Sequence, residues 1–424
     1  MRLRIYQSDK GDCLLVSGTA GGHILVDGGM RKAFQDHVRA DLGKMATNNE
    51  ALDLVYVSHI DQDHISGILE LLNNVLAWRV YDYRKKHNAK VKAPTYPRLP
   101  DIKEIWHNAF SDLLENNAGP VERLLAQSRL VLGLSSNPVL QAAAVRHHEL
   151  AYSVAEAIQV SQKVSPSQLN ILLNRQFNGQ LIMSRTPGQS TASIGKMEVF
   201  VIGPLPSEVK NLRDKWNDWL RDNRDKILKL KKEAEADARS IGNSADRISE
   251  LLAARVDELG NREAVTTPNL ASVMLLLVEG QKKVLLTGDG HWEDILKGLE
   301  HHGMFDAKGN LHLTALKVQH HGSEHNYNVN MAERVTADNY IFCGNGKHEN
   351  PDPRVVQLIC DSHRKVRPND TFTLWFNCDP SQAPDNKSRG HMRKIQSYTD
   401  QQFKTSGERV KSHYLSKSSF DCQL

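Results

Sequence analysis

The sequence of 424 residues lacks the cysteine patterns of a disulfide framework or of a cysteine zinc finger. Its five cysteines are odd in number and widely spaced, and no Cys-x-x-Cys pair occurs. No run of about 18 apolar residues is present, and the N-terminus enters an expected strand without a charged and then apolar leader. We therefore expect a cytoplasmic protein, in a reducing compartment, with no membrane partner.

Length and charge set only wide bounds. A net charge of +4 makes the chain mildly basic, which permits a polyanionic substrate without requiring one. Because domains typically hold about 100–200 residues, the chain could form two or three domains or one domain with large insertions. Composition alone leaves the substrate open.

One stretch of the chain gathers metal-ligand residue types directly after an expected strand. Residues 55–67 read V-Y-V-S-H-I-D-Q-D-H-I-S-G. The apolar run 54–57 predicts a strand, and residues 65–75 predict a helix. Between them stand His59, Asp61, Asp63 and His64. Such nitrogen and oxygen donors can converge on one or two divalent cations, whereas a turn that only caps a helix would need fewer of them.

Further polar residues follow other expected strands. Asp27 ends the expected strand 23–26 in a D-G-G turn. Asp289 follows K-V-L-L-T with a glycine on each side, as suits an acidic ligand that must approach a metal closely. The expected strand 313–318 runs straight into the pair His320 and His321.

Together these motifs resemble the metallo-β-lactamase superfamily, whose hallmark is His-x-His-x-Asp-His. Asp61 stands where the second histidine is usual, which resembles the branch typified by the ComEC-type DNA-uptake protein. G-D-C-L-L-V followed by H-I-L-V-D-G-G resembles the opening hairpin and first motif, and K-V-Q-H-H-G-S resembles the fifth motif of that branch. The resemblance covers somewhat over half of the chain. It implies an α/β fold, the αββα four-layer sandwich, here with large helical insertions.

The resemblance also implies a role for each motif residue. Asp27 would support the site without ligating metal, and Asp289 would bridge two ions. His320 is the favoured ligand of its pair, with His321 orienting it or touching substrate, although the sequence leaves that order open. The expected metal ligands are His59, Asp61, Asp63, His64, Asp289 and His320; the expected catalytic residues are Asp63, His321 and His348; the expected substrate contacts are Ser323, His325 and Tyr327.

The expected cofactors are two divalent metal ions about 3.5–4 Å apart, zinc first, with manganese or magnesium as alternatives. They would make hydroxide available at neutral pH for hydrolysis. The family's Gly-His-x-x-Gly element does not occur between His64 and Asp289, and Asn269 and Ser272 stand in the corresponding region. One ion is thus short of nitrogen ligands, and Asp61 makes its site harder in character.

We therefore expect a metal-dependent hydrolase that uses a metal-activated hydroxide. The first hypothesis is a phosphodiesterase or nuclease that acts on nucleic acid or nucleotides. The alternatives are a hydrolase of small acyl substrates, such as a lactone, thioester or amide, and an interaction protein whose helical insertions recruit a partner around a structural metal site. The basic loop 84–94 is a candidate phosphate-contacting arm. The charged segment 210–263 predicts a long helix or helical hairpin, packed on the core, a partner protein or a second copy.

The expected organisation divides one fold between two parts of the chain. Residues 1–83 and 265–380 are its N- and C-terminal parts, with a mostly helical insertion at 84–195, a core strand at 196–209, a charged helical insertion at 210–264 and a polar extension at 381–424. Local patterns predict a strand at 78–83, helix throughout 110–177 with His147 and His148 on its surface, and a strand at 372–377 that closes the sheet. For the basic tail from residue 387, the sequence does not decide between an ordered and a loose extension.

Overall fold

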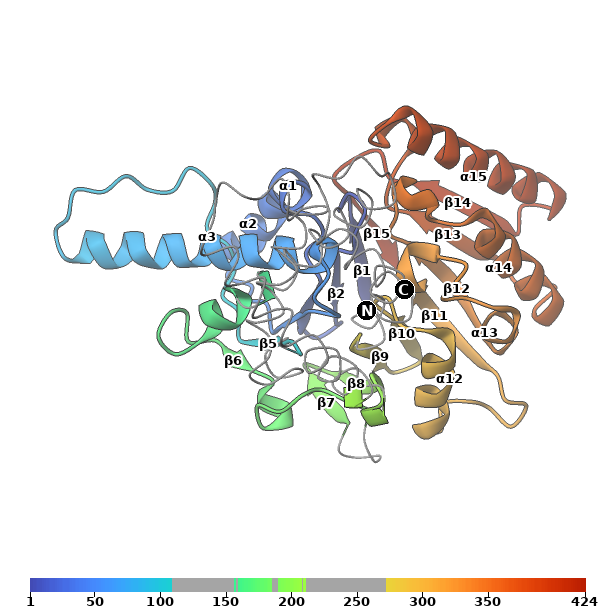
Figure 1. Ribbon diagram of the computed structural model, residues 1–424, viewed down its shortest axis with the longest axis horizontal. Helices are drawn as coiled ribbons and strands as arrows, with labels where there is room; N and C mark the ends of the chain where they lie inside the picture. Colours follow the sequence, from blue (N-terminus) through green and yellow to red (C-terminus); the bar gives the residue numbers. More distant parts are fainter. Residues whose placement is uncertain (109–155, 158, 185–189, 208, 211–271) are drawn as a thin grey trace, which may run out of the picture.

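Two β-sheets pack face to face in the computed structural model, with helices on both outer sides (Figure 1). The structure describes residues 1–108, 156–157, 159–184, 190–207, 209–210 and 272–424. The predicted α/β fold with αββα layers is confirmed.

In the described part of the chain, the first sheet has seven strands in the order β15-β1-β2-β3-β4-β5-β6. Their bounds are β1 Arg2–Tyr6, β2 Leu14–Ser17, β3 His23–Val26, β4 Leu54–Tyr56, β5 Glu104–Trp106, β6 Leu172–Leu173 and β15 Ser419–Gln423. Strands β1, β2 and β3 are antiparallel, and β3, β4 and β5 are parallel.

Eight strands of the described residues form the second sheet, in the order β14-β13-β12-β11-β10-β9-β8-β7. Their bounds are β7 Thr191–Ile194, β8 Met197–Gly203, β9 Met274–Glu279, β10 Lys282–Leu286, β11 Leu311–Lys317, β12 Val335–Phe342, β13 Phe372–Phe376 and β14 Val410–Tyr414. Strands β10 to β14 are mutually parallel.

Helices cover the outer face of each sheet. The first sheet carries α1 Arg31–Ala33, the π-helical turn η1 Phe34–Val38, α2 Arg39–Thr47 and α3 Gln62–Lys86. The second carries α12 Trp292–His301, α13 Val329–Arg334, α14 Pro353–Val366 and α15 Asn386–Thr405. Short 3-10 turns are η3 Arg175–Phe177, η4 Gln319–Gly322, η5 Lys347–Glu349 and η6 Pro380–Gln382.

Three hydrophobic cores separate the four layers. In β9, Leu275 and Leu277 point into the core between the sheets, whereas Met274 and Leu276 point toward the helices of the second sheet. Because both faces of such a strand are buried, its sequence is a continuous apolar run rather than an alternating one. The core between the sheets fixes the relative position of the two sheet edges that carry the polar motifs.

Helix α3 begins directly after the ligand-rich stretch and is locked to the D-G-G loop. Gly28 N donates to His64 O at 2.8 Å, and Gly67 N donates to Gly29 O at 3.0 Å. A Cβ atom at Gly67 would lie 1.9 Å from Gly28 O, so only glycine allows this crossing. The first turn of α3 is therefore held against the end of β3.

The predicted strand at 78–83 is wrong, because α3 continues through it to Lys86. Its valine and aromatic residues favour a strand locally, but tertiary contacts support the helix: the guanidinium of Arg98 lies 4.3 Å from the centre of the Trp78 ring. The prediction of helix throughout 110–177 is wrong at its end, where β6 and η3 lie. Residues 109–155, with His147 and His148, and residues 211–271 of the charged segment lie outside the described residues.

The C-terminal tail is an ordered extension that adds a strand to each sheet. Strand β14 pairs with β13 and lies outside it, so the prediction that residues 372–377 close the sheet is wrong. Strand β15 pairs with β1, which brings the two ends of the chain together (Figure 1). A polar composition concealed both roles, because edge strands need fewer apolar residues.

All five cysteines are buried and free, as the absence of a disulfide framework predicts. Within the described residues, no helix combines the length and the apolar composition needed to cross a bilayer.

Candidate metal centre

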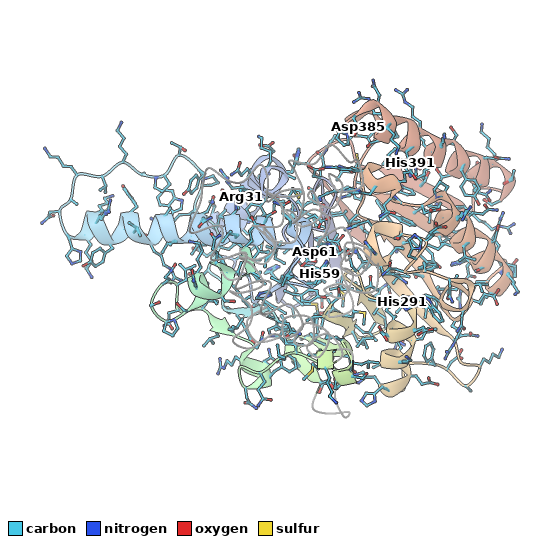
Figure 2. All side chains as sticks on the ribbon, viewed as in Figure 1. Arg31, His59, Asp61, His291, Asp385 and His391 are labelled. Atoms are coloured by element: carbon cyan, nitrogen blue, oxygen red, sulfur yellow. The ribbon has the colours of Figure 1, made fainter. Side chains whose placement is uncertain are left out.

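The polar strand ends of the two sheets meet at one place. Asp27 follows β3 and His59 lies beyond β4 in the first sheet, whereas Asp289 lies beyond β10, and His320 and His321 beyond β11, in the second. Because β3 and β4 are parallel, as are β10 and β11, each pair delivers its residues to one edge. Figure 2 shows His59 near the middle of the molecule, between the N-terminal and C-terminal parts.

Asp289 is the centre of the site. It is 3% exposed, and four histidine Nε2 atoms surround its carboxylate. The distances from Nε2 to an Asp289 carboxylate oxygen are 3.5 Å for His64, 3.6 Å for His59, 3.6 Å for His321 and 3.8 Å for His320. These separations exceed hydrogen-bond lengths. They match the roughly 3–4 Å between atoms that ligate one ion at about 2 Å each.

Three of the four histidines have a hydrogen bond at the other ring nitrogen, Nδ1, and the fourth, His321, has a close carboxylate contact there without a hydrogen bond. Nδ1 lies 2.9 Å from Asp27 Oδ2 in His64, 3.0 Å from Ser58 Oγ in His59, 2.7 Å from Asn326 Oδ1 in His320 and 3.2 Å from Asp12 Oδ1 in His321. With Nδ1 engaged, Nε2 is the nitrogen that remains to ligate metal.

The buried atoms at the centre lack hydrogen-bond partners. Nε2 of His59, Nε2 of His64 and Oδ1 of Asp289 are buried and form no hydrogen bond within the described part of the chain. Since buried polar atoms are normally satisfied, three that converge indicate a ligand. Among the residues that the structure describes, two groups of side chains could each hold a metal ion: His59, His64 and Asp289, and Asp12, His64 and His321. The donor set thus fits divalent metal ions.

Two further carboxylates line the site at different depths. Asp63 Oδ2 lies 3.4 Å from His321 Nε2, and the Asp63 side chain is 16% exposed. Asp61 Oδ2 lies 3.7 Å from His59 Nε2, and its side chain is 34% exposed. Asp61 therefore faces solvent, and Asp63 lies deeper.

Asp27 lies behind His64 and is completely buried. Its Oδ1 accepts a hydrogen bond from Ser58 N at 2.7 Å, and its Oδ2 accepts one from Ser58 Oγ at 2.7 Å and contacts His64 Nδ1. With both oxygens engaged, Asp27 has the arrangement expected of a residue that orients a ligand rather than binding metal.

Residues 8–120 match the family model of the metallo-beta-lactamase superfamily. The match includes the stretch from His59 to His64, while Asp289 and the 320–321 pair lie beyond it. The two-sheet fold is consistent with this superfamily, and the match together with the metal-binding groups supports a metal-dependent hydrolase. No curated protein gives a significant match to the chain.

Two buried charged residues of this metallo-beta-lactamase-like site were not predicted from the sequence. Asp12 is 1% exposed and Lys317 is 2% exposed. Lys317 Nζ donates to Gly288 O at 2.9 Å, forms an ion pair with Asp12 Oδ2 and lies 3.7 Å from Asp289 Oδ1. The signal was Lys317 itself, since a charged residue inside an apolar strand needs a buried partner.

The electrostatics of the centre favour cations. Burial opposes ionisation of Asp12, but the Lys317 ammonium and nearby histidines outweigh it and lower the pKa of Asp12 to about 2. Burial disfavours the His64 imidazolium, but carboxylates, Asp289 first, outweigh it and raise the pKa of His64 to about 9. Histidine charges likewise outweigh burial and hold the pKa values of Asp289 and Asp63 below the usual range. In this negative field a divalent cation competes with the imidazolium protons.

Asp289 reaches the centre because glycine precedes it. Gly288 has a φ of 49°, and a Cβ atom there would lie 2.9 Å from Ser58 Cβ. The strand β10 can therefore approach β4 closely, as the flanking glycines predict.

The remaining predicted residues lie around the site at different depths. Ser323 is buried, and its N–H donates to His320 O at 2.9 Å. His325 has a side chain that is 46% exposed. Tyr327 is 4% exposed within the core over the second sheet, which argues against its predicted contact with substrate. His348 lies on the exposed turn η5, which packs against α15.

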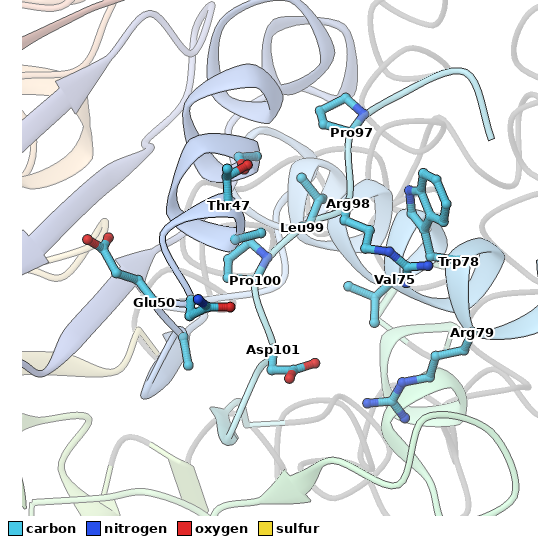
Figure 3. Close-up of a pocket in the computed structure, with 14 residues that line it drawn as sticks. Thr47, Glu50, Val75, Trp78, Arg79, Pro97, Arg98, Leu99, Pro100 and Asp101 are labelled. Carbon is cyan, nitrogen blue, oxygen red and sulfur yellow. The ribbon is translucent and has the colours of Figure 1, made fainter. Parts of the chain in front are cut away.

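A separate cavity of about 460 Å³ lies between α2, α3 and the segment 97–101 (Figure 3). Val75 and Trp78 contribute its α3 side. Val75 is 11 residues beyond His64, or about 16 Å along a helix. The cavity is therefore distinct from the metal centre.

Proposed function

We propose that the protein is a metal-dependent hydrolase that cleaves phosphodiester bonds in nucleic acid or nucleotides. The observation that carries this proposal is the convergence of four histidine Nε2 atoms on Asp289 from both sheets. Structural zinc sites are usually closed by four protein ligands. Asp61, with 34% of its side chain exposed, instead places one flank of this centre at the surface, as a site that admits substrate requires.

Two divalent ions, zinc first or else manganese or magnesium, suit the mixed donors. When bound, they would acidify a water molecule and neutralise charge on a phosphoryl oxygen. Asp289 lies among all four imidazoles, so it is the carboxylate able to serve both ions. Asp63 is ionised at neutral pH, since its pKa is lowered. It can ligate metal and accept a hydrogen bond from the attacking water.

The substrate class is supported by a basic arm, which we define as residues 79–98. It contains seven lysines and arginines and a single acidic residue, Asp82, which is already paired with Arg98 at 2.6 Å. Tyr83 is 66% exposed, and its ring centre lies 4.2 Å from that of His87. Exposed rings among basic side chains suit the bases and phosphates of nucleic acid. The end of α3 in this arm projects from the body of the protein (Figure 1). The resemblance to the ComEC-type branch favours the same class.

The experiment is hydrolysis of labelled single- and double-stranded DNA and RNA by protein loaded with zinc or manganese. We expect cleavage, and a decrease of more than roughly 100-fold in His64→Ala, which removes a central nitrogen. His312→Ala is the matched control. His312 is also a histidine near a carboxylate, with Nε2 3.0 Å from Asp338, but it lies at the other end of β11.

Metal-loaded protein that cleaves none of these nucleic acids would contradict the proposal, as would cleavage that survives in His64→Ala. Hydrolysis of neutral lactones, thioesters or amides at a rate insensitive to ionic strength would replace the phosphodiester with an acyl substrate. Metal retention without any hydrolysis would indicate the structural or interaction role.

A further inference from the structure

The turn that carries His320 and His321 has an unusual backbone. His320 has φ 47° and ψ 50°, and His321 has φ 54° and ψ 16°, both in the left-handed region. Side chains with a Cβ atom rarely adopt this region, because the Cβ crowds the following carbonyl oxygen. Surrounding bonds hold the turn: His320 N donates to Gly288 O at 3.1 Å, and Gln319 Nε2 donates to Asn326 O at 2.9 Å.

This backbone allows two consecutive histidines to face one carboxylate. In a strand, consecutive side chains point to opposite faces, so only one of the pair could reach Asp289. Here the rings of His320 and His321 are 5.8 Å apart and inclined by 72°. Their Nε2 atoms nevertheless lie 3.8 and 3.6 Å from the same oxygen, Asp289 Oδ2.

The two histidines have different surroundings beyond Asp289. His321 Nε2 lies 3.4 Å from Asp63 Oδ2, and its ring centre lies 5.2 Å from that of His64. His59 Nε2 lies 3.6 Å from Asp289 Oδ2, the oxygen that both histidines of the pair face. His320 can therefore act together with His59, and His321 together with His64 and Asp63.

Separate anchors hold each ring with Nε2 toward the centre. His320 Nδ1 lies 2.7 Å from Asn326 Oδ1, and Asn326 Nδ2 donates to Asp289 O at 3.0 Å. His321 Nδ1 lies 3.2 Å from Asp12 Oδ1, and the other Asp12 oxygen pairs with Lys317. Lys317 occupies one Asp12 oxygen, and the other faces His321 Nδ1 in a charge contact without a hydrogen bond, so we assign Asp12 to positioning His321.

We propose that His320 and His321 both ligate metal through Nε2, one on each side of Asp289. His320 joins His59, and His321 joins His64 and Asp63. His320 then supplies the nitrogen that the missing Gly-His-x-x-Gly histidine would otherwise provide, and the shortage expected from the sequence disappears. This inference rests on the metal centre of the proposed function, but not on the identity of the substrate.

The test is titration of metal-free protein with cobalt(II), followed by visible absorption and by metal analysis after equilibrium dialysis. We expect two equivalents in the wild-type protein, one in His320→Ala, one in His321→Ala and none in the double variant. The matched control, His312→Ala, keeps two. Circular dichroism checks folding. Asn326→Ala, which leaves His320 in place, is expected to weaken one equivalent by about 10–100-fold.

Two equivalents with wild-type affinity in His320→Ala would overturn the inference. So would a double variant that keeps one equivalent, because both histidines would then serve a single ion. Wild-type protein that binds no cobalt or zinc at all would overturn the proposed metal-dependent function as well. Two bound ions without nuclease activity would leave the ligand assignment standing and refute only the substrate.

Discussion

Buried charges in this protein are compensated residue by residue. The Lys317 ammonium lies between Asp12 from the first sheet and Asp289 from the second. Removing one member of such a buried pair typically costs about 3–5 kcal/mol, because the other charge stays buried without compensation. Lys317 thus ties the two sheets together beside the metal centre, and it holds in place the carboxylate that faces His321.

Glu156 is a buried acidic residue whose charge its partner compensates only in part. It is 5% exposed, one carboxylate oxygen pairs with Arg31 at 2.9 Å, and Oε2 has no hydrogen-bond partner among the described residues. Burial outweighs the Arg31 charge and raises the pKa of Glu156 to about 7, from the ordinary 4.5. The folded state therefore binds the Glu156 proton more tightly than the unfolded state does.

The pH dependence of stability at Glu156 follows from this raised pKa. The stabilisation from the bound proton is complete below pH 4.5 and is lost as the pH rises through about 7. We expect Glu156→Gln to gain stability relative to wild type between pH 5 and pH 8, by up to about 3 kcal/mol. Urea denaturation at both pH values measures this. A difference between the two proteins that does not change with pH would contradict it, and Glu324→Gln, in a surface ion pair with Arg354, serves as control.

At the scale of elements, helix α3 connects the metal centre to the basic arm. Its first turn contains Asp63, and its last turn contains Arg84, Lys85 and Lys86, where cations are favoured by the helix dipole. A helix of 25 residues is about 37 Å long. If the proposed function holds, the end of α3 in the arm is too far from Asp289 to touch the reacting bond, and it would contact only a long substrate that extends from the centre.

Removal of the arm's charge should therefore affect long and short substrates differently. We expect a variant with alanine at Lys85, Lys86 and Lys90 to bind a 30-nucleotide strand more weakly. The log–log slope of its salt dependence should be smaller by about 2, because each phosphate that the variant no longer neutralises removes roughly 0.7 from the slope. Cleavage of a dinucleotide should be unchanged.

Fluorescence anisotropy at several salt concentrations measures the binding, in an Asp63→Asn background that separates it from cleavage. A variant with alanine at Lys297, Lys308 and Lys404, three surface lysines of the C-terminal half, is the control. If the variant lost binding of the 30-nucleotide strand and cleavage of the dinucleotide to the same extent, the arm would instead act on stability or on the centre itself.

Elements with strong patterns were predictable from the sequence, and those that depend on tertiary context were not. Strand β3 and the strand before the ligands were found because their apolar runs end at polar turns. The second half of α3 was missed because its aromatic and branched residues favour a strand until the segment 97–101 packs on it. Strand β15 has no apolar signal of its own and is defined by pairing with β1.

The residues of the site also divide into those that the sequence predicts and those that depend on tertiary context. The residues of H-I-D-Q-D-H, Asp289 and the histidine pair were predictable because each follows a strand, and the structure brings them together. Asp12 looked like an ordinary turn residue, and its role depends on Lys317, 305 positions later. No local pattern reports such a pairing. The choice between His320 and His321 was equally hidden, because it depends on a left-handed backbone.

At the scale of the whole molecule, the centre exists only where the two sheets face each other. His59, Asp61, Asp63 and His64 come from the first sheet, and Asp289, His320 and His321 come from the second. The core between the sheets is built from apolar side chains such as Val26, Tyr56, Leu286 and Ala315. It fixes the spacing of the two ligand sets, so metal binding should report on correct packing of both halves.

The most direct test of the account is anomalous X-ray diffraction from crystals of the protein loaded with zinc or manganese, recorded on both sides of the metal absorption edge. The account predicts two anomalous peaks that flank the Asp289 carboxylate, one beside His59 and His320 and the other beside His64, His321 and Asp63. Absence of any peak at Asp289, or a peak ligated by Asp12 in place of His321, would contradict it.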